Sequence, residues 1–187
     1  MKKKIVVLAS GNGSNAERII TFFRENGLAE VTLVITNNPK AGVLERCQLL
    51  GVETMVALRD DFYNNQRVFS KLKNVTPDLI VLAGFLWLIP AEIIRAFRDR
   101  IINIHPALLP AYGGRGMYGH HVHEAVIAAK EEKSGITIHF VNEKYDQGDI
   151  LFQADTLITP DDTPESLAEK IHQLEYRYFP EIIESLL

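Results

Sequence analysis

The chain has 187 residues, a formal net charge of −4 and a hydrophobic fraction of 47%, with a single cysteine. This length and composition predict one soluble globular domain over residues 1–187. The negative charge argues against a nucleic-acid partner or an anionic membrane surface, and no apolar run is long enough to span a bilayer. The apolar run 5–9 is too short for the core of a signal peptide, and the lone Cys47 fits a reducing cytoplasm.

Apolar runs alternate with amphipathic segments in the first half of the chain. Helices are expected from Ser14 or Asn15 as the N-cap to Gly27, and then over 41–50, 60–74 and 91–97. This alternation predicts an α/β fold of Rossmann-like type, with a mostly parallel sheet and helices on both faces. Runs rich in Ile, Val and Leu predict its buried strands at 5–9, 31–36, 52–57, 79–83 and 101–105.

The pattern changes after residue 120. A helix over 121–130 precedes strands at 135–141 and 150–156. The connection between these strands is short, which predicts an antiparallel C-terminal strand pair. A last helix starts at Thr163-Pro164, and Pro180 is expected to kink or break it.

The first glycine-rich loop is a candidate anion site. In open parallel sheets, ligands bind beyond the carboxyl ends of the strands, where the strand order reverses. With the order 3-2-1-4-5, that point lies between the first and fourth strands. The loop Gly11-Asn12-Gly13-Ser14-Asn15 offers free amides and polar side chains to a phosphate there. NAD is disfavoured because Thr36-Asn37 occupies the position where NAD-binding proteins usually have an acidic residue that binds the ribose. The alternative interpretation of this loop is a tight turn with a helix cap and no ligand.

A second candidate is the pair Asn103 and His105. They lie two residues apart on the fifth predicted strand, so they project to the same face. An amide and an imidazole at a strand end suit a carbonyl oxygen that becomes negatively charged. Asp146, in the turn 145–149, would raise the pKa of His105 and orient its ring. The alternative is that these side chains only hold turns together, and His139 either joins them or lies in the core.

Three other features have two interpretations each. The apolar residues 85–88 would wall a pocket for a flat ring, or they pack in the core. His120 and His123 are spaced for one helix face, but surface histidines are favoured over a metal site. Cys47 is expected to pack in a helix and not to act as a nucleophile.

Four motifs occur in the order and spacing of a known family. They resemble the phosphoribosylglycinamide formyltransferases, folate-dependent enzymes of purine synthesis, and the similarity extends over essentially the whole chain. It implies a formyltransferase fold and transfer of the formyl group from 10-formyltetrahydrofolate to the amine of glycinamide ribonucleotide. It also implies small-molecule substrates, a monomer or homodimer, and no metal or NAD. The motifs are Gly11-Asn12-Gly13-Ser14-Asn15, Leu82-Ala83-Gly84-Phe85, Asn103-Ile104-His105-Pro106-Ala107-Leu108-Leu109-Pro110 and Tyr145-Asp146-Gln147-Gly148.

The resemblance also implies site residues. The substrate amine would attack the formyl carbon directly, without a covalent intermediate. Asn103 would donate to the resulting oxyanion, and Asp146 would keep His105 cationic and move a proton through a water. The residues fall into a catalytic trio, Asn103, His105 and Asp146; a ribonucleotide set, Gly13, Ser14, Asn15 and Glu175; and a folate set, Arg67, Leu86, Trp87, Leu88, Ile89 and Asn142.

This chain departs from the family pattern in two places. The segment 113–119 looks longer than in some members, and its glycines suggest a mobile flap. Trp87 and Ile89 are local variants in the expected folate wall.

Three other functions are kept as alternatives. A methionyl-tRNA formyltransferase would be expected to add a C-terminal RNA-binding domain, and a formyltetrahydrofolate hydrolase an N-terminal regulatory domain. Neither is expected within 1–187. A nucleotide-binding module would explain the first loop but would leave Asn103, His105 and Asp146 without a shared purpose.

Overall fold

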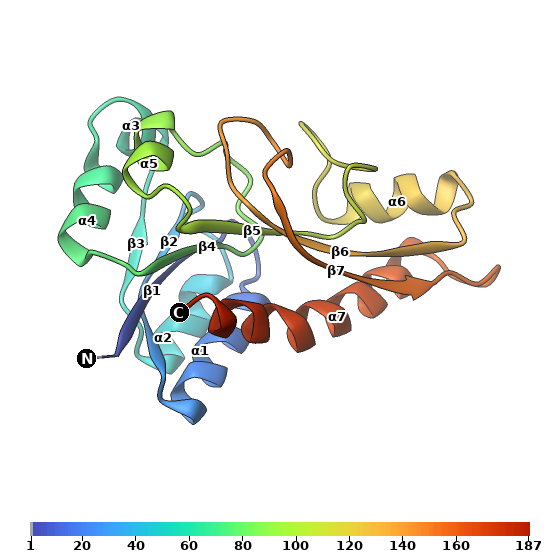
Figure 1. Ribbon diagram of the computed structural model, residues 1–187, viewed down its shortest axis with the longest axis horizontal. Helices are drawn as coiled ribbons and strands as arrows, with labels where there is room; N and C mark the ends of the chain where they lie inside the picture. The colour runs from blue at the N-terminus through green and yellow to red at the C-terminus, as the bar shows by residue number, and fades with distance from the viewer. Residues whose placement is uncertain (1) are drawn as a thin grey trace.

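The computed structural model describes residues 2–187 as one seven-stranded sheet with helices on both faces (Figure 1). The strand order is β3-β2-β1-β4-β5-β6-β7. The first five strands are parallel, and β5, β6 and β7 pair antiparallel. The predicted order and the predicted antiparallel pair are therefore confirmed. The strands are β1 (Lys3–Leu8), β2 (Ala29–Thr36), β3 (Thr54–Val56), β4 (Leu79–Leu82), β5 (Ile101–His105), β6 (Lys133–Phe140) and β7 (Ile150–Leu157).

Two apolar layers cover the two faces of the sheet. On β1, Ile5 and Val7 belong to one layer and Val6 and Leu8 to the other, because successive strand residues point to opposite faces. In Figure 1, α1, α2 and α7 lie along the lower side of the molecule, and α3, α4 and α5 lie at its left and upper left. No helix within residues 2–187 is long and apolar enough to cross a membrane. The first layer packs against α1 (Ser14–Asn26), α2 (Val43–Leu50), α6 (His120–Ala128) and α7 (Pro164–Ser185), the second against α3 (Arg59–Tyr63), α4 (Arg67–Val75) and α5 (Ala91–Ala96).

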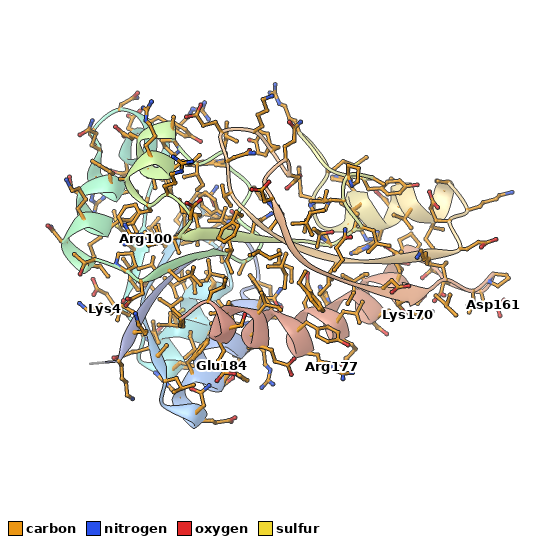
Figure 2. All side chains as sticks on the ribbon, in the orientation of Figure 1. Lys4, Arg100, Asp161, Lys170, Arg177 and Glu184 are labelled. Atoms are coloured by element: carbon orange, nitrogen blue, oxygen red, sulfur yellow. The ribbon has the colours of Figure 1, made fainter. Side chains whose placement is uncertain are left out.

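Helix α7 continues through Pro180, so the predicted break is wrong. A proline has no N–H to donate to the carbonyl four residues earlier, which here belongs to Tyr176. The Arg18 side chain supplies the missing donor, with Nε 3.1 Å from the Tyr176 oxygen. In Figure 2, the labelled Lys170, Arg177 and Glu184 follow this uninterrupted helix beneath the sheet.

The segment 60–74, predicted as one helix, forms two. Helix α3 ends at Tyr63, and α4 begins at Arg67 after Gln66, whose φ of 58° is left-handed. The Asn65 side-chain oxygen accepts the backbone N–H of Arg67 at 3.0 Å. Asparagine side chains offer the backbone local hydrogen bonds of this kind, which compete with helix continuation.

Helix α1 begins without a side-chain cap. Its N-cap is Gly13, at φ 79°, so the predicted cap by Ser14 or Asn15 is wrong. A Cβ on Gly13 would lie 2.4 Å from the Cγ2 of Val43, so only glycine lets α2 approach this closely. The Ser14 hydroxyl and the Asn15 amide are consequently not used to cap their own helix.

The loops that follow β1 and β4 meet at the carboxyl edge of the sheet. The backbone N–H of Ser10 donates to the Gly84 carbonyl at 3.0 Å, and the Leu86 N–H donates to the Ser10 hydroxyl at 3.0 Å. Lys4 and Arg100, labelled in Figure 2, mark the opposite, amino edge of β1 and β5. The reversal point of the strand order is thus held together by hydrogen bonds between its two loops.

Gly148 closes the β6–β7 connection, which carries Asp146. A Cβ at Gly148 would lie 1.6 Å from the Phe140 carbonyl oxygen. We expect Gly148→Ala to lower the free energy of unfolding by about 1–3 kcal/mol or more, because the backbone must move. Gly11→Ala is the matched control, since no atom lies within 4 Å of its added Cβ. Urea denaturation that gives both variants the same stability would contradict this close approach.

Candidate active site

A cavity of about 610 Å³ opens at the carboxyl edge of the sheet, beside the loops that follow β1 and β4. This volume lies within the range of pockets for small organic ligands. Its walls come from segments far apart in the chain: the loops after β1, β4 and β5, the β6–β7 connection, and one face of α7. The lining segments include 10–15, 83–86, 103–106, 114–119 and 145–146, with His123, Ile171, His172 and Glu175.

Asn103, His105 and Asp146 come together on one side of this cavity. The Asn103 Nδ2 lies 3.5 Å from one oxygen of Asp146, and the His105 Nδ1 lies 3.6 Å from the other. The latter oxygen also accepts the backbone N–H of Gly114 at 2.8 Å. The side chains of His105 and Asp146 are only 4% and 11% exposed. An amide, an imidazole and a largely desolvated carboxylate thus share one small volume.

The ring of His105 has a hydrogen-bond acceptor at each nitrogen. Nε2 lies 2.7 Å from the carbonyl oxygen of Tyr112, and Nδ1 faces the Asp146 carboxylate. An imidazolium, with N–H groups on both nitrogens, satisfies both neighbours. Burial nevertheless lowers the pKa of His105 below its ordinary value, against the opposing pull of Asp146. Asp146 does raise the pKa of His105, as predicted, but desolvation outweighs this attraction and makes the net shift downward.

Asp146 is held in its charged form. Burial alone would raise the pKa of this carboxyl, but the nearby His139, the charge of His105 and the N–H of Gly114 outweigh burial and lower it. The free protein therefore carries a carboxylate here at neutral pH.

His139 joins this network from the neighbouring strand. Its Nδ1 lies 2.8 Å from the Phe140 carbonyl, and its Nε2 lies 3.1 Å from the Asn103 Nδ2 and 3.7 Å from Asp146. A proton on Nδ1, donated to that carbonyl, leaves Nε2 to accept from Asn103. In the register of β5 and β6, Asn103 stands opposite His139. Sheet pairing thus fixes which way the amide of Asn103 points.

The expected ribonucleotide residues line the same cavity. Gly13, Ser14 and Asn15 form the start of α1, and Glu175 projects from α7. Asn15 Nδ2 donates to a Glu175 oxygen at 2.8 Å. Burial raises the pKa of Glu175 to about 7, although the bond from Asn15 opposes the rise. The first and last helices therefore meet through a hydrogen bond between residues 160 positions apart.

Of the expected folate residues, Leu86 lines the cavity. Trp87 packs its ring against Phe62, with centroids 5.6 Å apart, and the Asn142 Nδ2 donates to the Gln147 carbonyl at 2.8 Å within the β6–β7 connection. The cavity wall does not include Arg67, Trp87, Leu88, Ile89 or Asn142.

Three further cavity residues were missed by sequence reasoning. His123 is 3% exposed, so its placement on the surface is wrong, whereas His120 and His121 are exposed. Burial, with neighbouring His172, lowers the pKa of His123 to about 4. The sequence could have identified His172 as a cavity residue, because it precedes Glu175 by three residues on the same helix and therefore lies on the same face. Arg115 lies in the segment 113–119, which was expected to form a flap near the site, but no pattern in the sequence marks Arg115 itself as a site residue.

The described residues do not form a side-chain cluster suited to binding a metal ion. Within residues 2–187, no cluster of three or more His, Cys, Asp or Glu side chains could hold an ion. Cys47 is buried in the core, and burial raises the pKa of its thiol to about 11. A thiol of this kind is a poor nucleophile, as expected from the sequence.

Known proteins resemble the chain over nearly its whole length. The family model for formyl transferases matches residues 3–183. A chloroplastic phosphoribosylglycinamide formyltransferase from Arabidopsis thaliana is 39% identical over 191 residues, which cover 99% of this chain and 65% of that protein. The Bacillus subtilis phosphoribosylglycinamide formyltransferase is 37% identical, covering 99% of this chain and 95% of that protein. The chain thus spans less than two thirds of the plant relative.

A solved structure shows the same fold. The crystal structure of phosphoribosylglycinamide formyltransferase from Bacillus halodurans superposes with a TM-score of 0.88 at 36% identity. The match covers 99% of this chain and 95% of that chain. The sheet order and the antiparallel addition described above are therefore those of the formyltransferase fold.

The buried Glu175 predicts a pH-dependent stability. Its folded pKa of about 7 lies above the free value of 4.5, so the folded state holds this proton more tightly. The resulting stabilisation is complete below about pH 4.5 and is lost as the pH rises through about 7. Glu175→Gln lacks this loss. Its free energy of unfolding relative to the wild type should rise by about 3 kcal/mol between pH 4.5 and 8.

Urea titrations of both proteins at each pH measure this difference, and the other titrating groups largely cancel in it. A difference that stays constant with pH would show that Glu175 ionises as freely as an exposed glutamate.

Proposed function

The chain belongs to the formyl transferase family, and on that premise we propose that it transfers the formyl group of 10-formyltetrahydrofolate to the amine of glycinamide ribonucleotide. The observation that carries this proposal is the meeting of Asn103, His105 and Asp146 in one cavity with the loop 11–15. One face of the cavity thus suits a developing oxyanion, and the other suits a phosphate. The names of the relatives from Arabidopsis and Bacillus support the choice of substrates.

The loop 11–15 would hold the ribonucleotide. The first backbone N–H groups of α1 have no acceptor within their helix, and they point beyond its N-terminus towards an anion. The Ser14 hydroxyl is also available, since it does not cap the helix. Anchoring the substrate at its phosphate would hold the amine near the formyl carbon, which lowers the entropic part of the barrier.

Asn103 and His105 would stabilise the tetrahedral intermediate. The contact from Asn103 Nδ2 to Asp146 is 3.5 Å, which is long for a hydrogen bond, so this proton is available to a substrate oxygen. Negative charge on that oxygen would favour the cationic form of His105, which burial disfavours in the free protein. One donor of this type typically lowers the barrier by about 3–4 kcal/mol.

Asp146 would move the proton. As the C–N bond to the amine forms, the amine nitrogen loses a proton to the carboxylate through a water molecule. As the C–N bond to the folate breaks, the same proton passes to the leaving folate nitrogen. The low pKa of Asp146 supports this role, because the group must start as a base.

The folate would lie beside Leu86 and the turn at Asp146. Leu86 belongs to the expected folate set, Tyr145 follows Asn142 of that set by three residues, and both line the cavity. We also propose folate contacts for the rest of that set, which consists of Arg67, Trp87, Leu88, Ile89 and Asn142.

A spectrophotometric assay tests the reaction. The protein is mixed with 10-formyltetrahydrofolate, with and without glycinamide ribonucleotide, and loss of the formylated folate is followed. Loss that requires the ribonucleotide supports the proposal. Loss without an acceptor would indicate a hydrolase, and dinucleotide binding without turnover would indicate a nucleotide-binding module.

Asp146→Asn should remove the base and keep the shape of the side chain. We expect kcat to fall about 100- to 1000-fold with little change in either KM, since a proton-transfer group acts mainly in the transition state. Asp155→Asn is the control, because Asp155 is a largely exposed carboxylate on β7. Near-normal kcat in Asp146→Asn would reject the role of Asp146.

Ser14→Ala should weaken binding of the ribonucleotide. Loss of one hydrogen bond to a charged group predicts a rise of about 10-fold in the KM for this substrate, with kcat and the KM for the folate little changed. Ser70→Ala, on the exposed surface of α4, is the control. An unchanged KM for the ribonucleotide in steady-state assays would argue against phosphate binding at Ser14.

A further inference from the structure

Arg115 is the one permanent cation in the cavity wall. Among the described residues that line the cavity, it is the only lysine or arginine. Burial lowers the pKa of His105, His123 and His172. These imidazoles are therefore largely neutral at pH 7 in the free protein. Asp146 carries a full negative charge, so without Arg115 the cavity would repel an anionic ligand.

The guanidinium of Arg115 is not engaged by the protein. The side chain is exposed and makes no hydrogen bond or salt bridge with any of residues 2–187. Both carboxyl groups of the cavity have other partners: Asp146 binds the Gly114 N–H, and Glu175 binds Asn15. An arginine that faces a cavity without an internal carboxylate suits an oxyanion of a ligand.

The backbone ties the segment that carries Arg115 to the wall of the cavity. Gly114 and Gly116 flank it at φ 97° and 90°, a region that other residues rarely adopt. The Gly114 N–H donates to Asp146 at 2.8 Å, so the neighbour of Arg115 is tied to the carboxylate. Figure 1 shows the β5–α6 connection, which carries Arg115, rising beside the β6–β7 connection, which carries Asp146.

We propose that Arg115 binds the phosphate of the acceptor substrate and thereby selects a phosphorylated amine. This inference rests on the proposed function for the identity of the acceptor. The loop 11–15 offers neutral N–H and O–H donors, and Arg115 supplies the positive charge that a phosphate of about −1.5 to −2 requires. The glutamate tail of the folate is the competing anion. It is disfavoured because Arg115 shares the cavity with the loop 11–15, whereas most of the expected folate set lies outside it.

Steady-state kinetics of Arg115→Gln test the assignment. We expect the KM for the ribonucleotide to rise about 10- to 100-fold, which corresponds to the loss of a charge-assisted hydrogen-bonding partner. The KM for the folate should stay unchanged. Arg115→Lys keeps the charge without the planar fork, so its KM should lie between those of the wild type and Arg115→Gln. Arg98→Gln is the control, since that side chain is 86% exposed and lies outside the cavity.

Two kinetic outcomes would overturn the proposal. One is an unchanged KM for the ribonucleotide in Arg115→Gln. The other is a rise confined to the KM for folates with glutamate tails, which would assign the cation to the folate.

A binding measurement separates this proposal from the proposed function. Calorimetric titration of the wild type with ribose 5-phosphate and with ribose reports the phosphate site without any turnover. We expect binding of the phosphorylated sugar alone, weakened at least 10-fold in Arg115→Gln. Equal binding to both proteins, or none to the wild type, would overturn the proposal. Binding that depends on Arg115 in a protein without formyl transfer would retain this site and reject the proposed reaction.

Discussion

The arrangement of the active site depends on one largely desolvated carboxylate, that of Asp146. A carboxylate with an 11% exposed side chain is unstable unless donors and positive charge surround it. Three segments surround it: β5 donates through Asn103, the β5–α6 connection donates through Gly114, and His105 on β5 and His139 on β6 lie 3.6 and 3.7 Å from it. Each of these segments is therefore held in place partly by the charge it solvates. The antiparallel strands β6 and β7 matter because their connection returns Asp146 to the end of β5.

The two halves of the fold supply different parts of the chemistry. The parallel half presents the start of α1 and its loop, a geometry for anions. The antiparallel half presents the carboxylate and the imidazoles. Helix α7 joins them, because Arg18 donates to the Tyr176 carbonyl and Asn15 donates to Glu175. These contacts, together with the hydrogen bond from Asn26 to Glu184, hold the first helix against the last and so fix the position of the anion site.

The sequence predicts those features that depend on neighbouring residues. The pairing of β6 with β7 and the shared face of Asn103 and His105 follow from periodicity and short connections, and the strand order is the common one for a fold of this class. Predictions were wrong or missing for features that depend on residues far apart in the sequence. The continuity of α7 at Pro180 depends on Arg18, which is 158 residues from Tyr176. The burial of His123 depends on how α6 packs, which its own histidine-rich sequence does not reveal.

The charge state of His105 shows why electrostatics is the hardest part to predict. A nearby carboxylate raises the pKa of an imidazole, and the family resemblance implies that Asp146 is near. Burial acts in the opposite sense and outweighs it, and its size depends on the whole fold. The same low-dielectric surroundings strengthen any interaction with a negative oxygen in the cavity. The imidazolium form of His105, which burial disfavours in the free protein, is therefore stabilised when negative charge develops on a bound substrate.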